Sequence, residues 1–281
     1  MIHGLGGVLL VAGALWTSAA VAQGSDALLG LINDYRATAH RCAGKPVAMA
    51  GPLTADAALA NATPVAGGKL TEALRAAGYP AARSLAITLT GPGDAGSAMR
   101  MLAENYCGEL SSERYSEIGI ARDGTRWRIV LAQPVLSPEL GSSREAGMRV
   151  LELVNAARAE ARSCGARKFE AVAPVAWSDR LASTALAHSS DMARHDYFAH
   201  AGRDGSQVGA RATKHGYDWR AIGENIAAGQ GSAQRVVAGW LSSPGHCVNI
   251  MSRDFTEMGA AYAVNRGSAS TIYWTQVFGT R

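Results

Sequence analysis

The amino-acid sequence predicts an α+β fold arranged as two layered domains in tandem. Three observations lead to this prediction: a length of 281 residues, an internal repeat, and helical patterns that precede strand patterns in the second half. At roughly 100–200 residues per domain, this length accommodates two small domains behind a short leader. Helices followed by strands are typical of layered α+β folds rather than of Rossmann-like folds.

The composition indicates a globular protein. Hydrophobic residues make up 48% of the chain and charged residues 18%, which provides a core and excludes a disordered or collagen-like chain. The net charge is +4. Residues 23–141 carry 11 basic and 11 acidic side chains, whereas residues 142–281 carry 16 and 12, so the excess lies in the second half. These basic residues are not clustered, so we expect no nucleic-acid partner.

The first 22 residues are predicted to be a secretory signal peptide. The segment from Gly4 to Trp16 is almost wholly apolar, and the small residues Ala20-Val21-Ala22 follow it. This pattern is typical of cleavage after Ala22. The alternative is a membrane anchor, but the apolar run is shorter than the ~20 residues that a span needs. We therefore expect a mature protein without a membrane span, secreted or periplasmic.

An internal repeat relates the two halves. The first match pairs Leu31–Arg36 and Cys42 with Leu153–Arg158 and Cys164, at an offset of 122. Four more matches follow in the same order: Gly78-Tyr79 with Gly216-Tyr217, Tyr106-Cys107 with His246-Cys247, Glu117-Ile118-Gly119 with Glu257-Met258-Gly259, and Ala132-Gln133 with Thr275-Gln276. Ordered matches predict a tandem duplication; the alternative is chance similarity between Ala- and Gly-rich segments. The predicted domains are 23–136 and 144–281, joined by a linker over 137–143.

The four cysteines are predicted to form two disulfides. An even number of cysteines in an exported chain favours disulfides over reactive thiols. The repeat selects one of the three possible connectivities, with Cys42 bonded to Cys107 and Cys164 to Cys247. The alternative is that the cysteines are free, buried thiols.

The second half contains an extra segment that the first half lacks. The offset between aligned positions rises from 122 at Cys42 to 138 at Tyr79. The added residues fall around His188–Ser206, and five of the seven histidines lie between His188 and His246. Glu224 aligns with Ala86, and His246 with Tyr106. We therefore expect the polar site residues, which are histidines and Glu224, to belong to the second half alone.

Periodicity and capping signals predict the elements of the second half. Helical spacing of apolar residues predicts a helix over Glu145–Ala161, and Ser178 is the expected N-cap of a helix over Asp179–Arg194. Beyond these we expect a short helix over Gln207–Lys214, a strand over Ile222–Ala227, a helix capped by Ser232, a helical turn from Pro244, and strands over Glu257–Val264 and Thr271–Phe278.

Four motifs follow one another in the second half: Phe198-Ala199-His200, Gly223-Glu224-Asn225-Ile226, Trp240-Leu241-Ser242-Ser243-Pro244-Gly245-His246, and Tyr273-Trp274-Thr275-Gln276-Val277-Phe278-Gly279. Together they resemble the CAP superfamily of cysteine-rich secretory proteins, antigen 5 and class 1 pathogenesis-related proteins, in particular its bacterial exported branch. The resemblance covers residues 144–281 and implies an α-β-α sandwich with a groove across one face. The first half resembles a degenerate copy through the repeat, so two tandem sandwiches are expected.

The resemblance also implies a groove with two histidines and two glutamates, which bind a divalent metal in some members. His200 and Glu224 match the first histidine and the first glutamate. The position of the second glutamate falls near Ser242 or Ser243, so that glutamate is absent, and Tyr273 stands where the second histidine is usual. His246 is the expected substitute, and Glu257 is a candidate second carboxylate.

Two imidazoles and a carboxylate make a zinc site with one open position, so His200, Glu224 and His246 are candidate ligands for Zn²⁺ or another divalent metal. The alternative is a buried hydrogen-bonded network that holds loops to the sheet. His188 and His195 are candidate partners of these ligands. The sequence favours a secreted CAP protein that binds a lipid, cell-wall fragment or peptide, with a metal-dependent hydrolase or peptidase and a protein-interaction module as alternatives.

Overall fold

The computed structural model describes residues 15–62, 69–136 and 140–281. Residues 1–14 of the predicted signal peptide lie outside the described residues. Its residues 15–22 belong to the first helix, α1 (Leu15–Arg36). In this described portion of the chain, no helix is both long enough and apolar enough to cross a membrane. The predicted linker also lies partly outside, at residues 137–139.

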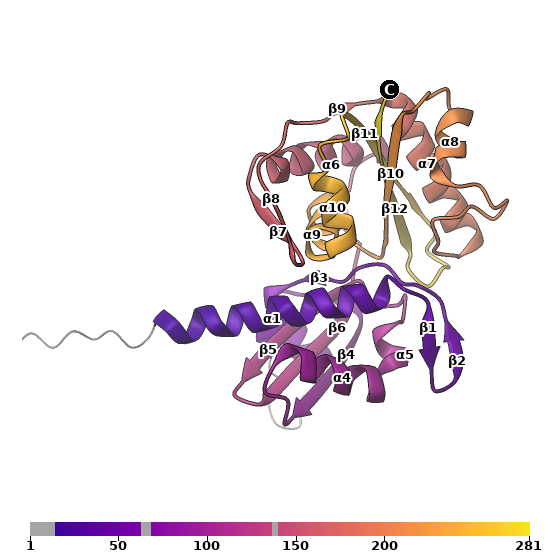
Figure 1. The fold of residues 1–281 in the computed structure, drawn as a ribbon. Coiled ribbons are helices and arrows are strands. Elements are labelled where there is room, and N and C mark those ends of the chain that lie inside the picture. The colour runs from indigo at the N-terminus through magenta and orange to yellow at the C-terminus, as the bar shows by residue number, and fades with distance from the viewer. Residues whose placement is uncertain (1–14, 63–68, 137–139) are drawn as a thin grey trace, which may run out of the picture.

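The first half begins with α1 and ends with β6 (Figure 1). Between them, in chain order, lie β1 (His40–Cys42), β2 (Lys45–Val47), β3 (Thr54–Ala55), α2 (Ala57–Asn61), α3 (Leu70–Ala76), β4 (Ala81–Thr90), α4 (Ala95–Asn105), α5 (Cys107–Leu110) and β5 (Glu117–Asp123), and β6 itself spans Arg126–Pro134. Buried residues of α1, α4 and α5 pack on one face of the sheet, and those of α2 and α3 pack on the other.

The second half repeats this arrangement with longer elements. In chain order they are α6 (Ser143–Arg158), β7 (Arg162–Cys164), β8 (Arg167–Phe169), β9 (Ala176–Trp177), α7 (Asp179–His195), α8 (Val208–Lys214), β10 (Ala221–Ala228), α9 (Ala233–Ser242), α10 (Pro244–Met251), β11 (Glu257–Val264) and β12 (Ile272–Thr280). Helices α6, α9 and α10 pack on one face of the sheet, and α7 and α8 pack on the other. The predicted α+β fold with sandwich layers is confirmed.

The capping signals locate the helices of the second half correctly. Ser178 accepts a hydrogen bond from the Leu181 N–H at the start of α7, and Ser232 accepts one from the Arg235 N–H at the start of α9. Side-chain capping of this kind satisfies backbone donors that have no partner within the helix. Local sequence is therefore enough to fix where these two helices begin.

The two four-stranded sheets have the same strand order and the same pairing directions. The orders are β3-β5-β6-β4 and β9-β11-β12-β10. In each sheet the two-residue strand pairs parallel to its neighbour, and the other pairs are antiparallel. This likeness agrees with the predicted repeat, while a tandem duplication as its origin stays a prediction.

One of the five sequence matches has the wrong register. Gly119 pairs with Val130 in the first sheet, and its counterpart Gly259 pairs with Val277 in the second. Val130 therefore corresponds to Val277, and Ala132-Gln133 does not correspond to Thr275-Gln276. The corrected register aligns Trp127 with Trp274, and each indole N–H donates to a backbone carbonyl, Pro92 and Gln230 respectively.

A buried arginine holds each half together in the same way. Arg158 is 1% exposed and donates from Nε and both Nη atoms to four carbonyls, those of Ala173 (2.7 Å), Ile250 (2.7 Å), Ser252 (2.8 Å) and Phe255 (3.4 Å). Arg36, also 1% exposed, contacts the carbonyls at the aligned positions, Gly51, Leu110, Ser112 and Tyr115. Each arginine therefore ties the first helix of its half to two later segments of that half.

Both predicted disulfides are present. Cys42 is bonded to Cys107, with Cα atoms 5.6 Å apart, and Cys164 is bonded to Cys247, with Cα atoms 5.5 Å apart. Each one joins the short hairpin after the first helix to a later helix, α5 or α10. The connectivity derived from the repeat is confirmed.

The halves contact each other through polar groups around α9. Arg235 of α9 reaches Asp56 (2.9 Å) and Glu117 (2.5 Å) of the first half. Nearby, the Gln230 side-chain amide donates to the Pro52 carbonyl at 2.7 Å, and the Ser116 hydroxyl donates to the Gly229 carbonyl at 2.9 Å. These bonds fix the second sheet against the first half.

Glu117 is the buried acid of this interface. Its side chain is fully buried and accepts from the Tyr79 hydroxyl at 2.6 Å as well as from Arg235. Burial raises the pKa of Glu117 from 4.5 to about 7, and the Tyr79 hydrogen bond and the Arg235 charge oppose this rise in part. Asp56 adds to the rise because a neighbouring carboxylate disfavours a second negative charge.

The raised pKa of Glu117 predicts a pH-dependent stability. Because the folded chain keeps this proton between pH 4.5 and 7 while the unfolded chain loses it, the stabilisation is complete below pH 4.5 and is lost as the pH rises through 7. Glu117→Gln removes this dependence. We expect the free energy of unfolding of the variant, relative to the parent, to increase by about 3 kcal/mol between pH 4.5 and 8.5.

Denaturant unfolding of both proteins across this pH range checks the prediction. Glu104→Gln is the matched control, because Glu104 is exposed on α4. Parallel pH profiles for the parent and the Glu117→Gln variant would contradict the account of this interface.

Candidate functional site

The site is built around Glu224 on strand β10. Successive side chains of a strand point to opposite faces, so Glu224 faces α7 and α8 while its neighbour Asn225 faces α10. Asn225 donates to the Gln276 side chain at 3.0 Å and accepts from Asn249 of α10 at 2.9 Å. The Gly-Glu-Asn motif thus places a carboxylate on one face and anchors α10 on the other.

Three basic side chains surround the Glu224 carboxylate, which is 3% exposed. His200 Nδ1–H donates to Oε1 at 2.9 Å, and Arg211 Nη2 donates to Oε2 at 2.7 Å. His188 Nε2 lies 3.9 Å from Oε1. We call Glu224, His200, Arg211 and His188 the Glu224 network.

Glu224 is ionised at neutral pH. Burial raises the pKa of the carboxyl, but the hydrogen bond from His200 and the positive charge of Arg211 outweigh it, so that the pKa is below its ordinary value. Arg211 is 8% exposed and supplies the compensating positive charge. A buried carboxylate that is paired and hydrogen-bonded in this way is strongly anchored.

His188 is a neutral, buried member of the network. Its Nε2–H donates to the Ala199 carbonyl at 2.9 Å, because a carbonyl only accepts. Burial lowers the pKa of His188, with the nearby Arg211 charge in the same direction and Glu224 opposing it. Its Nδ1 is buried and has no hydrogen-bond partner among the described residues. His188 therefore presents a free acceptor atom.

Arg211 also shapes the loop that precedes its helix. From the middle of α8 its guanidinium donates to the Ser206 carbonyl at 2.5 Å and to the His200 carbonyl at 2.9 Å. Both carbonyls belong to the loop between α7 and α8. The network thus fixes the segment in which the second half is longer than the first.

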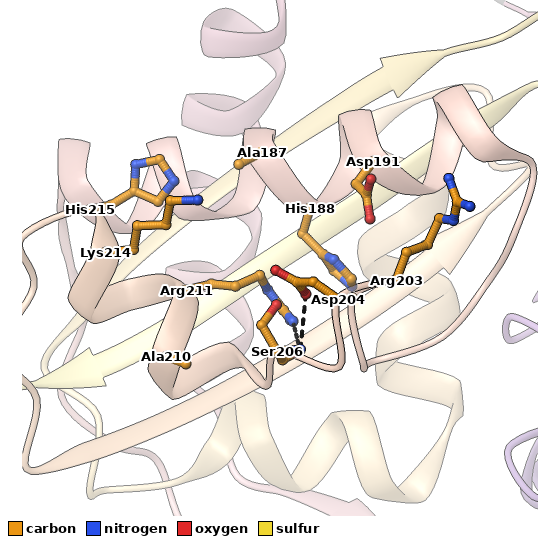
Figure 2. Close-up of a pocket in the computed structure, with 11 residues that line it drawn as sticks. Ala187, His188, Asp191, Arg203, Asp204, Ser206, Ala210, Arg211, Lys214 and His215 are labelled. Carbon is orange, nitrogen blue, oxygen red and sulfur yellow. Dashed lines mark hydrogen bonds between the residues drawn. The ribbon is translucent and has the colours of Figure 1, made fainter.

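A pocket of about 420 Å³ lies against this segment (Figure 2). Figure 2 shows side chains from α7, from α8 and from the connecting loop pointing toward one another. His188 and Arg211 belong both to the Glu224 network and to the pocket wall. The other lining residues are Ala187, Asp191, Gly202, Arg203, Asp204, Ser206, Ala210, Lys214 and His215.

His246 lies on a helix that packs on the face of the sheet opposite α7 and α8. It belongs to α10, and its Nδ1 is 2.9 Å from the Ser243 hydroxyl. Burial, with a smaller effect from the His200 charge, lowers the pKa of His246 to about 3. His246 is therefore neutral at physiological pH.

The remaining predicted site residues have partners outside the network. Glu257 begins β11 and forms an ion pair with Arg281 at 2.7 Å. The Tyr273 hydroxyl donates to Asp196 at 2.7 Å, just beyond the end of α7. His195 pairs with Asp191 at 2.9 Å. Their places in a ligand groove stay predictions.

Among the described residues, the ligand atoms of His200, Glu224 and His246 do not all lie within 4.8 Å of one another. Within the described ranges, the group of His, Cys, Asp or Glu side chains whose ligand atoms all lie within 4.8 Å of one another is in the first half, and it excludes His200, Glu224 and His246. The Glu224 oxygens already accept from His200 and from the Arg211 cation. Metal binding by these residues stays a prediction that this arrangement does not favour.

The sequence reasoning missed Arg211. A lone arginine on a short helix resembles any solvated surface residue, and its role depends on the strand that follows. The available signal was the rise in the alignment offset from 122 to 138, because the added residues include the loop that Arg211 holds in place.

Comparisons with known proteins place the second half in a family. Residues 151–278 match the model of the CAP family, described as the cysteine-rich secretory protein family. "Uncharacterized protein YkwD" of Bacillus subtilis is 33% identical over 130 residues, which cover 46% of this chain and 45% of the relative. "Uncharacterized membrane protein YlbC" of the same organism is 25% identical over 187 residues, which cover 64% of this chain and 49% of the relative.

The chain thus spans about half the length of these curated relatives. Among solved structures, an extracellular protein containing a SCP domain from Bacillus anthracis is similar, with a TM-score of 0.41 and 22% identity. The similarity covers 56% of this chain and 53% of that one.

Proposed function

Residues 151–278 of this chain belong to the CAP family, and from that premise we propose that it is an extracellular binding protein. Its ligand is a small zwitterionic molecule, such as a short peptide or the peptide part of a cell-wall fragment. The ligand occupies the pocket between α7 and α8. The observation that carries this proposal is that His188 and Arg211 belong both to the buried Glu224 network and to the pocket wall.

The charges of the pocket favour a ligand with both signs. Arg203 and Lys214 offer positive charge, and Asp191 and Asp204 offer negative charge. A zwitterion satisfies both kinds of group, whereas a simple anion or cation leaves one kind unpaired. Because the apolar lining consists of small residues such as Ala187 and Ala210, the wall offers little surface to a lipid tail.

The pocket wall is held rigidly by the Glu224 network, which also favours ligand binding. Binding costs less when the residues that contact a ligand are already ordered. The guanidinium of Arg211 is held by Glu224 and by two loop carbonyls, so the pocket wall is preorganised. We expect the first half to act as a scaffold, a degenerate copy of the CAP domain in which α2 has five residues where α7 has 17.

An extracellular location is in keeping with the covalent structure. All four cysteines are in disulfides, and disulfides persist in oxidising compartments. We propose that the chain is exported, with residues 1–22 as its signal peptide.

Calorimetric titration with a soluble peptidoglycan stem peptide tests the proposal. We expect the parent to bind, and the double variant Arg203→Ala with Lys214→Ala to bind at least about ten-fold more weakly. The control is Arg167→Ala with Lys168→Ala, which removes the same charge from an exposed hairpin outside the pocket. Binding of a fatty acid instead of the peptide, or equal weakening in both double variants, would contradict it.

A further inference from the structure

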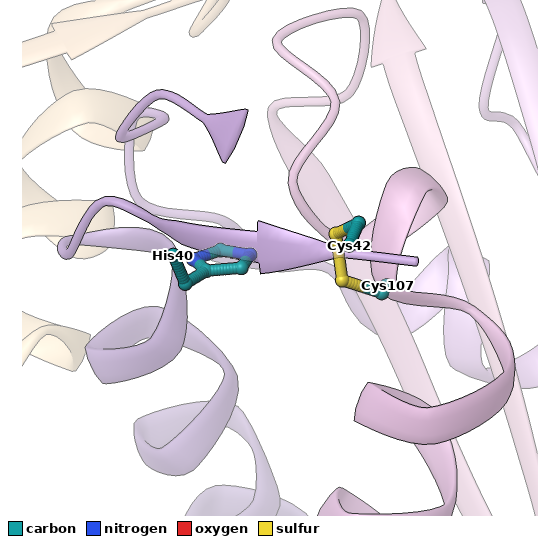
Figure 3. Close-up of side chains that lie close together, drawn as sticks. All are labelled: His40, Cys42 and Cys107. Atoms are coloured by element: carbon teal, nitrogen blue, oxygen red, sulfur yellow. A yellow bond between two sulfur atoms is a disulfide. The ribbon is translucent and has the colours of Figure 1, made fainter. Parts of the chain in front are cut away.

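A separate polar cluster surrounds the Cys42–Cys107 disulfide in the first half. Possible ligand atoms of His40, Cys42 and Cys107 all lie within 4.8 Å of one another, and all three side chains are partly exposed. In Figure 3 the His40 ring extends toward the sulfur atoms. We propose that reduction of this disulfide exposes a three-ligand site for a thiophilic divalent cation such as Zn²⁺, formed by His40, Cys42 and Cys107.

The His40 ring is already in the tautomer that a metal ligand needs. Its Nδ1–H donates to the Thr38 carbonyl at 2.8 Å, because a carbonyl only accepts. Nε2 therefore carries the lone pair, and it accepts from the Ser111 hydroxyl at 2.8 Å. Histidines that bind metals typically donate their second ring N–H to a carbonyl or carboxylate in this way.

A tyrosine supports the cysteine side of the cluster. The Tyr35 hydroxyl donates to Cys107 Sγ at 2.9 Å, since a disulfide sulfur carries no proton. After reduction the same hydroxyl stabilises the Cys107 thiolate, because a hydrogen bond to the charged form favours it. The Tyr35 ring also packs on His40, with ring centroids 4.0 Å apart, and so holds the imidazole in place.

The second disulfide provides an internal comparison. Cys164 and Cys247 are 3% and 0% exposed, whereas Cys42 and Cys107 are partly exposed. A reductant therefore reaches the first disulfide more readily, and exposed disulfides are the labile ones. The residues that support the first cluster are replaced at the aligned positions: Tyr35 by Ala157, His40 by Arg162 and Ser111 by Met251.

The chemistry balances with a dithiol as reductant. The dithiol gives two electrons and two protons to the disulfide, becomes a disulfide itself, and leaves Cys42 and Cys107 as thiols. Binding of Zn²⁺ displaces both thiol protons to solvent. Two thiolates and the His40 Nε2 lone pair then hold the ion, with water in the fourth position.

Cobalt binding by the full chain tests the proposal, because thiolate–Co²⁺ bonds absorb strongly in the near ultraviolet. We expect no such band in the oxidised protein, and one equivalent of Co²⁺, displaceable by Zn²⁺, after anaerobic reduction with limiting phosphine. Alkylation and mass spectrometry should find Cys42 and Cys107 reduced before Cys164 and Cys247. Bound Zn²⁺ should protect the first pair from alkylation.

His40→Ala separates this site from binding by cysteines alone. We expect its affinity for Co²⁺ to fall at least about ten-fold, while Arg162→Ala, at the aligned position beside the second disulfide, leaves the affinity unchanged. Circular dichroism confirms folding of each variant, and His40→Gln replaces the alanine variant if that one unfolds. Equal affinity in parent and His40 variants, two equivalents bound, or no cobalt band after reduction would overturn the proposal.

Discussion

Replacing Arg211 with methionine is expected to lower the free energy of unfolding of the second half by about 4 kcal/mol. The substitution leaves the Glu224 carboxylate, 3% exposed, without its cation, and an uncompensated buried charge costs about 3–5 kcal/mol. It also leaves the His200 and Ser206 carbonyls without their donor. Hydrogen exchange of the amides of β10 and β12 measures the loss, because it reports on the second half alone.

The control for this experiment is Arg203→Met. Arg203 lines the same pocket but is exposed, so we expect a change within about 0.5 kcal/mol. Adding Glu224→Gln to Arg211→Met should restore part of the lost stability, since the pair is coupled. A loss below about 1 kcal/mol, or no recovery in the double variant, would show that Glu224 does not depend on Arg211.

Replacing Arg158 with methionine should destabilise the second half further, by about 5 kcal/mol. Four carbonyls then lose the guanidinium that joins them to α6, and each buried group left unsatisfied costs about 1–3 kcal/mol. Arg149→Met is the matched control on the same helix, because Arg149 forms an exposed ion pair with Glu152 that contributes little. The same exchange experiment measures both variants.

Arg36→Met repeats this test in the first half, where amides of β5 and β6 are the reporters. Because Arg36 bonds the carbonyls at the aligned positions, we expect a loss of similar size. For either arginine, the free energy of unfolding could instead fall by no more than one unsatisfied carbonyl costs. That result would show that the arginine does not hold the first helix of its half to the later segments.

Much of the fold was predictable because its signals are local. Ser178 and Ser232 mark helix starts through a side chain that bonds a nearby backbone N–H. The disulfides followed from the repeat, since Cys42 and Cys164 occupy aligned positions. Local signals of this kind need no knowledge of the partner strand.

What the sequence could not predict depends on how distant segments pack. The match of Ala132-Gln133 with Thr275-Gln276 failed because residue identity alone does not report the register of a strand. The register depends on hydrogen bonds to the neighbouring strand, which place Trp127 opposite Arg122. The resemblance to the CAP family grouped His246 with Glu224. Because α10 packs on the face of the sheet opposite α7 and α8, their place in one groove stays a prediction.

We propose that the pocket between α7 and α8 binds a zwitterionic peptide. The most direct test is a titration of the ¹⁵N-labelled chain with the peptidoglycan stem peptide, followed by NMR chemical shifts of its amides. We expect shifts concentrated in residues 187–215, around His188 and Arg211, with the amides of the first half unchanged. Shifts centred elsewhere in the chain, or none at saturating peptide, would contradict it.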